Sequence, residues 1–270
     1  MGQDLLRMLV CDLDGTLLMH GAPFDPRDVR ALRGLASDDV VRVIATGRAL
    51  ATARKVIAAD FPIDYLIFSS GAGVLDWRTQ ELLAAHSMRP DEVAVATAVF
   101  VAHELDFMIH APVPEQHIFR FHRTGRSNAD FERRLARYVA EGRVLETPSE
   151  GASQLLAVYP QSDAELVERL RRALPHLSLI RATSPLDGRS MWIEAFAPTV
   201  SKSQAAARIA QQHSIAPEHV WAIGNDYNDW DLLRWAGRAA VVTGAPESMC
   251  AELMTVSSVS AWLSASASTD

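Results

Sequence analysis

Two aspartates, Asp12 and Asp14, stand at the end of a short apolar segment near the start of this 270-residue chain. The apolar residues 8–11 are typical of a buried strand, and the Gly15-Thr16 pair that follows Asp14 predicts a turn. We therefore expect both carboxylates at the carboxyl end of the strand, where open α/β sheets bind ligands. Carboxylates this close need a divalent cation, a shared proton or a basic side chain as a partner. The alternative is an ordinary strand-ending turn, in which Asp and Thr side chains bond to nearby backbone.

A second apolar strand, over residues 41–46, ends in Thr46 and Gly47 and precedes a helical pattern that starts at Ala49. A hydroxyl and backbone N–H groups beside a helix N-terminus can bind a phosphate. The alternative is an ordinary turn in which Thr46 caps the helix. Arg48 could either contact a substrate or brace the cleft, and the sequence leaves both roles open.

A lysine, Lys202, lies in the third segment, just before a helical stretch over residues 204–212. A lysine in the first turn of a helix is poorly placed for the helix dipole, but well placed to neutralise an anion bound there. The alternative is a solvated surface lysine, which is the usual state of this residue type.

The fourth segment is a strand over residues 220–223 followed by a loop rich in side-chain oxygens. The loop contains Asn225, Asp226, Asn228 and Asp229. Such a density of oxygen ligands suits a hard cation such as Mg²⁺. The alternative is a turn rich in Asn and Asp that binds nothing.

In this order, the four segments resemble the signature of the haloacid dehalogenase superfamily. The chain resembles its Cof-type sugar-phosphatase branch, with a large cap between the second and third segments, and the resemblance runs from Leu9 to about Ala245. There is one departure. The family usually has Asp where this chain has Asn225, and a small or polar residue where it has Asp226, so the source of the third metal ligand is left open.

The resemblance implies a role for each residue of these segments. Asp12 would attack phosphorus and form an aspartyl-phosphate, and Asp14 would act as general acid and then as general base. The residues that would bind the phosphoryl group or substrate are Thr46, Gly47, Arg48 and Lys202.

The resemblance also implies a Mg²⁺ cofactor. The implied ligands come from Asp12, from the backbone carbonyl of Asp14, and from Asn225 or Asp226. Asp229 and Asn228 would lie behind these ligands, and Asp229 would orient Lys202 or a metal-bound water.

The alternation of strands and helices predicts an α/β fold with a doubly wound, Rossmann-like parallel sheet. Residues 1–80 and 194–270 would form this core, and residues 81–193 an inserted α+β cap. A Ser69-Ser70-Gly71 turn would end the third strand without a ligand role. The predicted strands are 8–12, 41–46, 65–69, 107–110, 155–159, 177–181, 191–195, 220–223 and 239–242. The predicted helices are 27–36, 50–59, 94–104, 130–141, 163–174, 204–212 and 230–235, and the end of the Ser- and Ala-rich tail 258–270 would be frayed.

Composition limits the partners. The formal net charge of −7 argues against nucleic acid and against an anionic membrane surface. No apolar run reaches the length of a membrane span, and the N-terminus lacks a signal-peptide pattern. Two cysteines, Cys11 and Cys250, imply no disulfide framework, which predicts a cytoplasmic protein.

The sequence therefore predicts a Mg²⁺-dependent phosphatase that acts on a small phosphorylated metabolite, in particular a sugar phosphate. A phosphomutase of the same superfamily is the second hypothesis, because it shares this core. A phosphosugar-binding regulator with little turnover is the third, but binding alone does not need the nucleophile Asp12. The sequence does not set the physiological substrate, the cap residues that contact it, or the oligomeric state.

Overall fold

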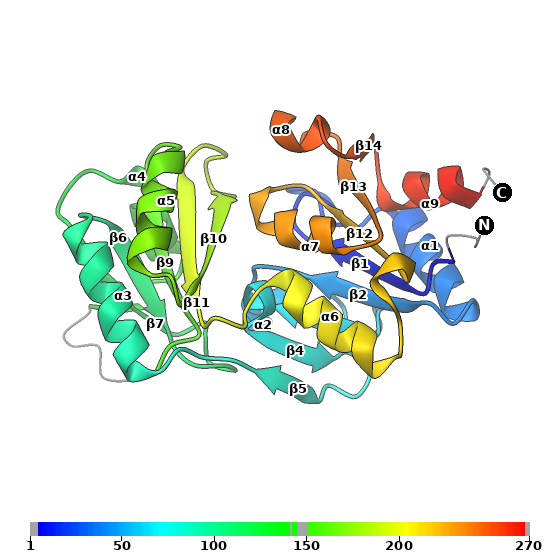
Figure 1. Ribbon diagram of the computed structural model, residues 1–270, viewed down its shortest axis with the longest axis horizontal. Coiled ribbons are helices and arrows are strands. Elements are labelled where there is room, and N and C mark those ends of the chain that lie inside the picture. Colours follow the sequence, from blue (N-terminus) through cyan, green and yellow to red (C-terminus); the bar gives the residue numbers. More distant parts are fainter. Residues whose placement is uncertain (1–4, 141, 145–150, 268–270) are drawn as a thin grey trace. The chain divides into compact units, whose positions relative to one another are not determined.

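The computed structural model describes residues 5–140, 142–144 and 151–267 (Figure 1). It divides the chain into two compact units. The core unit runs to Arg48, continues over Ala53–Ala84 and resumes at Ser201, and the cap unit comprises Ala49–Thr52 and Ala85–Val200. Residue 141, where a helix was expected to end, and residues 268–270 of the tail lie outside the described residues.

The core unit is built on an eight-stranded sheet of order β14-β13-β12-β1-β2-β3-β4-β5. β1 lies at its centre and pairs in parallel with β12 and β2. The predicted doubly wound parallel sheet is thereby confirmed, with β4 added antiparallel to β3. The strands are β1 (Met8–Asp12), β2 (Val41–Ala45), β3 (Tyr65–Phe68), β4 (Gly73–Asp76), β5 (Leu82–Ala85), β12 (Val220–Gly224), β13 (Arg238–Val242) and β14 (Met254–Val256).

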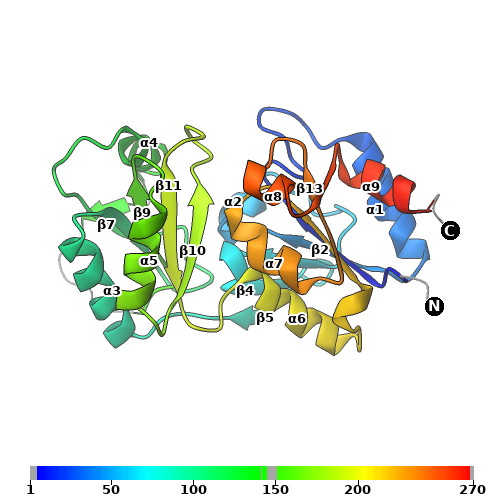
Figure 2. The same ribbon diagram turned by 45° about the horizontal axis from the view of Figure 1, so that its top comes forward.

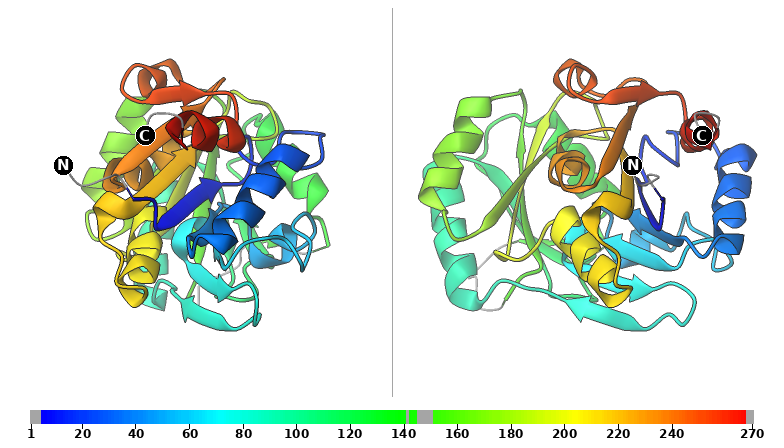
Figure 3. Two further views of the ribbon diagram at one scale, coloured as in Figure 1. Left: turned by 90° about the vertical axis from the view of Figure 1, so that its right-hand side faces the viewer. Right: turned by 45° about the vertical axis from the view of Figure 1, so that its right-hand side comes forward.

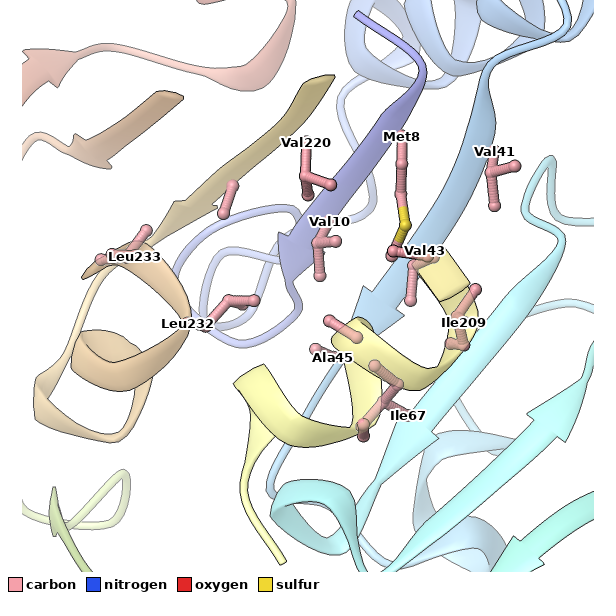
Figure 4. Close-up of a cluster of buried hydrophobic side chains, with 14 of the residues drawn as sticks. Met8, Val10, Val41, Val43, Ala45, Ile67, Ile209, Val220, Leu232 and Leu233 are labelled. Carbon is pink, nitrogen blue, oxygen red and sulfur yellow. The ribbon is translucent and has the colours of Figure 1, made fainter. Parts of the chain in front are cut away.

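Helices cover both faces of the core sheet, as the two views of Figure 3 show. α6 (Lys202–Gln212) and α7 (Trp230–Trp235) cover one face, and α1 (Pro26–Ser37) and α9 (Val259–Ala267) the other. Met8 and Val10 of β1 join the apolar cluster under α6 and α7 (Figure 4). Side chains alternate along a strand, so Asp12 also points to the α6 face. The remaining short elements of the core unit are α8 (Glu247–Cys250) and the 3₁₀ turns η1 (Ser69–Gly71), η2 (Pro217–His219) and η3 (Tyr227–Asp229), whereas most of the short helix α2 (Leu50–Ala53) belongs to the cap unit.

One predicted helix is much shorter than expected. Residues 50–59 were expected to be helical, but α2 ends at Ala53. The N–H of Val56 bonds to the carbonyl of Ala53, three residues back, so the chain leaves the helix through a tight turn.

The cap unit has a six-stranded sheet of order β10-β11-β9-β6-β7-β8. Phe107 of β6 packs on Phe100 of α3, whereas its neighbour Met108 packs in a cluster with Phe131 of α4. α3 and α4 therefore cover opposite faces of the sheet, and α5 lies beside α3 (Figure 2). The elements are α3 (Pro90–Ala102), β6 (Asp106–His110), β7 (Phe119–His122), α4 (Ala129–Arg137), β8 (Gly142–Val144), β9 (Gln154–Tyr159), α5 (Ala164–Ala173), β10 (Ser178–Thr183) and β11 (Met191–Phe196).

The predicted α+β character of the cap is confirmed, although both of its ends differ from the expected limits. β5 belongs to the core sheet, and β11 lies wholly in the cap sheet, where it pairs with β9 and β10. Among the described residues, none of the helices is long and apolar enough to cross a membrane.

Candidate active site

Four strand ends meet at one edge of the core sheet. β12, β1, β2 and β3 are neighbours and run parallel, so the residues after each strand lie together at the carboxyl edge. All four predicted segments contribute to this edge, because α6 begins with Lys202 on the face to which Asp12 points.

Lys202 lies between two carboxylates. Its side chain is 0% exposed, which excludes the alternative of a solvated surface lysine. The Nζ atom donates to Asp12 Oδ1 at 2.7 Å and to Asp229 Oδ1 at 2.5 Å. The hydroxyl of Ser201 caps α6 by accepting the N–H of Gln204, which fixes the turn that carries Lys202.

This cluster carries one more negative than positive charge. Burial, with the nearby charge of Asp229, raises the pKa of Asp12 to about 7, although the Lys202 ammonium opposes the shift. Burial alone would lower the pKa of Lys202, but the two carboxylates raise it well above its ordinary value. Asp12 Oδ2 is buried and has no hydrogen-bond partner among the described residues. An unpaired buried oxygen beside excess negative charge fits a cation.

Asp229 connects the fourth segment to Lys202. Its Oδ2 accepts the backbone N–H groups of Asn225 at 2.9 Å and Asp226 at 3.2 Å. Gly224 is required at the end of β12, because an added Cβ would lie 2.5 Å from the Asp229 carboxyl group. Asp229 therefore holds the loop with one oxygen and Lys202 with the other, and lies behind Asp12 at the site.

The side chain of Asn225 packs against the turn that follows Asp14. Gly15 has φ +83°, and a Cβ there would lie 2.2 Å from Asn225 Nδ2. Asp226 is the next residue and is half-buried. Within the described ranges, no three His, Cys, Asp or Glu side chains form a metal cluster.

Thr46 and Gly47 form a small seat at the end of β2. The side chain of Thr46 is buried, and its Oγ1 accepts the N–H of Arg48 at 3.1 Å. A Cβ on Gly47 would lie 3.6 Å from Ser70 Oγ and 3.9 Å from Asn228 Nδ2. Asn228 therefore lies beside Gly47, at the predicted phosphate seat.

The turn after β3, for which no ligand role was expected, lies beside Thr46 and Gly47. Ser69 and Ser70 are buried with φ of 46° and 53°, a conformation that costs energy for residues other than glycine. The N–H of Ser70 bonds to the carbonyl of Thr46 at 3.0 Å. Its place in the sequence could have indicated this, because the turn follows β3, which is the neighbour of β2 in the sheet.

Arg48 binds Asp14 within the core unit. Its Nε donates to Asp14 Oδ2 at 2.8 Å and its Nη2 to Oδ1 at 2.6 Å. The side chain of Arg48 is therefore paired with the second aspartate of the first segment.

The sequence matches the haloacid dehalogenase-like hydrolase family over residues 9–259. The chain therefore belongs to this family, which confirms the resemblance seen in the sequence and the expected enzyme class, a hydrolase.

Similar proteins agree with this assignment. A Mycoplasma pneumoniae protein to which phosphatase activity is ascribed is 22% identical over 236 residues, which is 83% of this chain and 82% of the relative. A phosphatase of the superfamily from Bacteroides thetaiotaomicron superposes with a TM-score of 0.77 at 20% identity, over 98% of this chain and 95% of that one. A subclass IIB sugar phosphatase superposes with a TM-score of 0.74 at 17% identity, over 97% of both chains. At these identities the superpositions show the shared fold.

Proposed function

We propose that this protein is a Mg²⁺-dependent phosphatase that hydrolyses small phosphate monoesters through an aspartyl-phosphate on Asp12. The observation that carries the proposal is the state of Asp12, a buried carboxylate held by Lys202 through Oδ1 while Oδ2 has no partner in the described structure. A carboxylate fixed in this way at a strand end is suited to attack phosphorus.

The reaction follows from the two aspartates of the first segment. An oxygen of Asp12 forms a bond to phosphorus while the bond from phosphorus to the leaving alcohol breaks. Asp14, whose side chain is 40% exposed, gives a proton to the leaving oxygen. Asp14 then takes a proton from a water molecule, whose oxygen bonds to phosphorus while the bond from phosphorus to the Asp12 oxygen breaks. Inorganic phosphate leaves, and Asp12 is restored.

The non-bridging oxygens of the phosphoryl group need donors. An ammonium group has three N–H bonds, and Asp12 and Asp229 accept two of those of Lys202, so one remains for a phosphoryl oxygen. Thr46, the N–H of Gly47 and the amide of Asn228 supply further groups at the same edge of the sheet.

Mg²⁺ fits the residues that are present. The Asp12 carboxylate, the backbone carbonyl of Asp14 and the side chain of Asn225 or Asp226 would hold it. When bound, it offsets the negative charge of Asp12 and the phosphoryl group.

A sugar phosphate is the substrate class that we favour, supported by the fold shared with a subclass IIB sugar phosphatase. The unpaired thiols of Cys11 and Cys250 support a cytoplasmic location.

The test is phosphate release from a panel of phosphorylated metabolites, with Mg²⁺ and with excess chelator. Chelation should abolish release and Mg²⁺ should restore it. Asp12→Asn should remove turnover, and Asp14→Asn should lower it at least ~10²-fold. Asp38→Asn, at an exposed aspartate of the core unit, should behave as wild type. Isomerised sugar phosphate without released phosphate would indicate a mutase, and binding without either product a regulator.

A further inference from the structure

Asp14 and Arg48 form a two-pronged ion pair that occupies both carboxylate oxygens. Arg48 donates to Oδ2 through Nε at 2.8 Å and to Oδ1 through Nη2 at 2.6 Å. A group that gives a proton to a leaving alcohol must turn one oxygen toward it. While both Asp14 oxygens bind Arg48, the ion pair holds the carboxyl group toward the guanidinium, and turning it to a leaving oxygen means breaking at least one of these bonds.

Arg48 also belongs to the phosphate seat through its backbone. Its N–H donates to Thr46 Oγ1 at 3.1 Å, and its carbonyl accepts the N–H of Ser69 at 2.8 Å. The backbone of Arg48 is thus held by the ends of two neighbouring strands. The Arg48 side chain begins at this turn, so its guanidinium can reach an anion that is bound beside Thr46 and Gly47.

The pair is weak enough to be displaced. The side chains of Arg48 and Asp14 are 30% and 40% exposed, so water screens their attraction. A phosphoryl dianion carries more charge than a carboxylate and accepts the same planar pair of N–H donors. It can therefore compete with Asp14 for Arg48.

We propose that Arg48 is a positioning residue that exchanges its two donors between Asp14 and the phosphoryl group. Without an anion, Arg48 holds the Asp14 carboxyl group away from the position in which it would give a proton to the leaving oxygen. When a phosphoryl group takes over the guanidinium, the Asp14 carboxyl group is released to face the leaving oxygen. This inference rests on the proposed function, since it concerns how the acid of that reaction becomes available.

The experiment measures the affinity of inorganic phosphate, with saturating Mg²⁺, by calorimetry. The four proteins are wild type, Asp14→Asn, Arg48→Gln and the double variant. Removing the competitor should tighten phosphate binding by about threefold to fivefold in Asp14→Asn, the value of a half-exposed ion pair. In the Arg48→Gln background the same change should have little effect.

Simple charge repulsion makes the opposite prediction. Asp14 would repel phosphate at least as strongly once Arg48 no longer neutralises it, so the gain from Asp14→Asn would be equal or larger in the Arg48→Gln background. That result would overturn the proposal, as would the absence of phosphate binding to the wild type. Arg48→Lys, which keeps the charge without the planar pair of donors, serves if Arg48→Gln does not fold, and should likewise weaken the coupling.

A surface arginine provides the matched control. Arg54 donates to Gln80 at 2.9 Å in the same unit, and Arg54→Gln should leave both the phosphate affinity and the effect of Asp14→Asn unchanged. Because phosphate binding is measured without turnover, a substrate panel that releases no phosphate would contradict the proposed function without affecting the interpretation of the binding experiment. If the two substitutions showed no coupling in phosphate affinity while the enzyme still turned over, only the proposed exchange of Arg48 between Asp14 and phosphate would be contradicted.

Discussion

At the scale of single residues, the site depends on a lysine with no exposed surface. Lysine is almost never fully buried unless it is paired, and Lys202 is paired twice, with Asp12 and Asp229. The pairs connect the end of β1 to the loop after β12. The lysine therefore has a structural part, and in the proposed reaction also a chemical one, because it offsets the charge of the proposed nucleophile Asp12 and positions its carboxylate.

Lys202→Met should destabilise the protein strongly, because two carboxylates would remain buried without their cation. The expected loss in the free energy of unfolding is ~3–5 kcal/mol, measured by urea titration. Adding Asp229→Asn should recover part of it, since one of the stranded charges is then removed. Lys55→Met, at an exposed lysine, is the control. A loss for Lys202→Met no larger than that of the control would contradict the buried pairing.

The neutral Asn225 at a position where the family usually has Asp should weaken the metal site. Asn225→Asp adds a carboxylate, so Mg²⁺ should bind more tightly in calorimetry of the protein without substrate. Because Asn225 packs against Gly15, beside Asp14, Asn225→Ala should lower Mg²⁺ affinity more than Asp226→Ala. The reverse order would assign the ligand to Asp226, and no change in any variant would show that the loop does not bind the metal.

At the scale of elements, the sequence predicted the long buried strands and the amphipathic helices, and it missed the short ones. β1 and β12 are apolar up to their last residue, and Arg42 is the one charged residue within β2, so all three strands stand out as short apolar runs. β7 was not predicted, because its alternation of Phe119 and Phe121 with Arg120 and His122 spans four residues only, which is too short a pattern to define a strand. Backbone strain at Ser69 and Ser70 has no pattern in the sequence, so that contribution to the site needed the structure.

The contact between η1 and the start of α6 is a sensitive point. Gly71 has φ +106°, and a Cβ there would lie 2.4 Å from the carbonyl oxygen of Ser201. Gly71→Ala should therefore displace the first turn of α6 and with it Lys202. We expect a loss of at least ~1–3 kcal/mol, the usual cost of such backbone strain, together with weaker phosphate binding.

Gly125→Ala separates the clash from the strain. Gly125 has φ +81° but open space around its Cα, so the substitution carries conformational strain alone. Its phosphate affinity should equal that of the wild type. Unchanged phosphate binding in Gly71→Ala would show that α6 is not held through this contact.

A buried histidine in β6 should make the cap unit sensitive to acid. Burial, with the charge of Arg134 as a second cause, lowers the pKa of His110 to about 3 from an ordinary value of 6.5. The unfolded chain takes up this proton below about pH 6.5 and the folded chain does not. The contribution of His110 to the free energy of unfolding is therefore fully present above that pH, and it falls by ~1.4 kcal/mol per pH unit below it.

Between about pH 7 and about pH 5.5, His110 alone should lower the free energy of unfolding by ~1 kcal/mol, which urea titration would show as a lower midpoint. His110→Asn should remove that part of the drop, whereas His176→Asn, at an exposed position, should retain it. Equal pH dependence in all three proteins would contradict the buried neutral histidine.

At the scale of the whole molecule, the sequence predicted which segments converge in the core unit, but not the contacts between their side chains. Every residue with an expected catalytic, phosphate-binding or metal role lies in the core unit, where parallel strands bring distant segments to one edge. Motif order could predict this convergence, but it could not predict that Arg48 holds Asp14 or that Ser70 reaches Gly47, because side-chain direction depends on packing.

Charge at this scale opposes substrate approach. The net charge of −7 repels a phosphate ester at long range, so in the proposed function its binding would have to come from the local donors at the strand ends. We therefore expect phosphate affinity to depend on Lys202 and the metal far more than on surface lysines or arginines such as Arg54.

The most direct test of the account is to trap the phosphoryl group on the protein. Asp14→Asn is mixed with Mg²⁺ and a reactive aryl phosphate, quenched in acid within its first turnovers and digested for mass spectrometry. We predict one added phosphoryl group on the peptide that contains Asp12, because the variant forms the aspartyl-phosphate but activates water poorly. The same peptide from the Asp12→Asn variant should carry none. Phosphate release by Asp12→Asn at the wild-type rate would contradict the account.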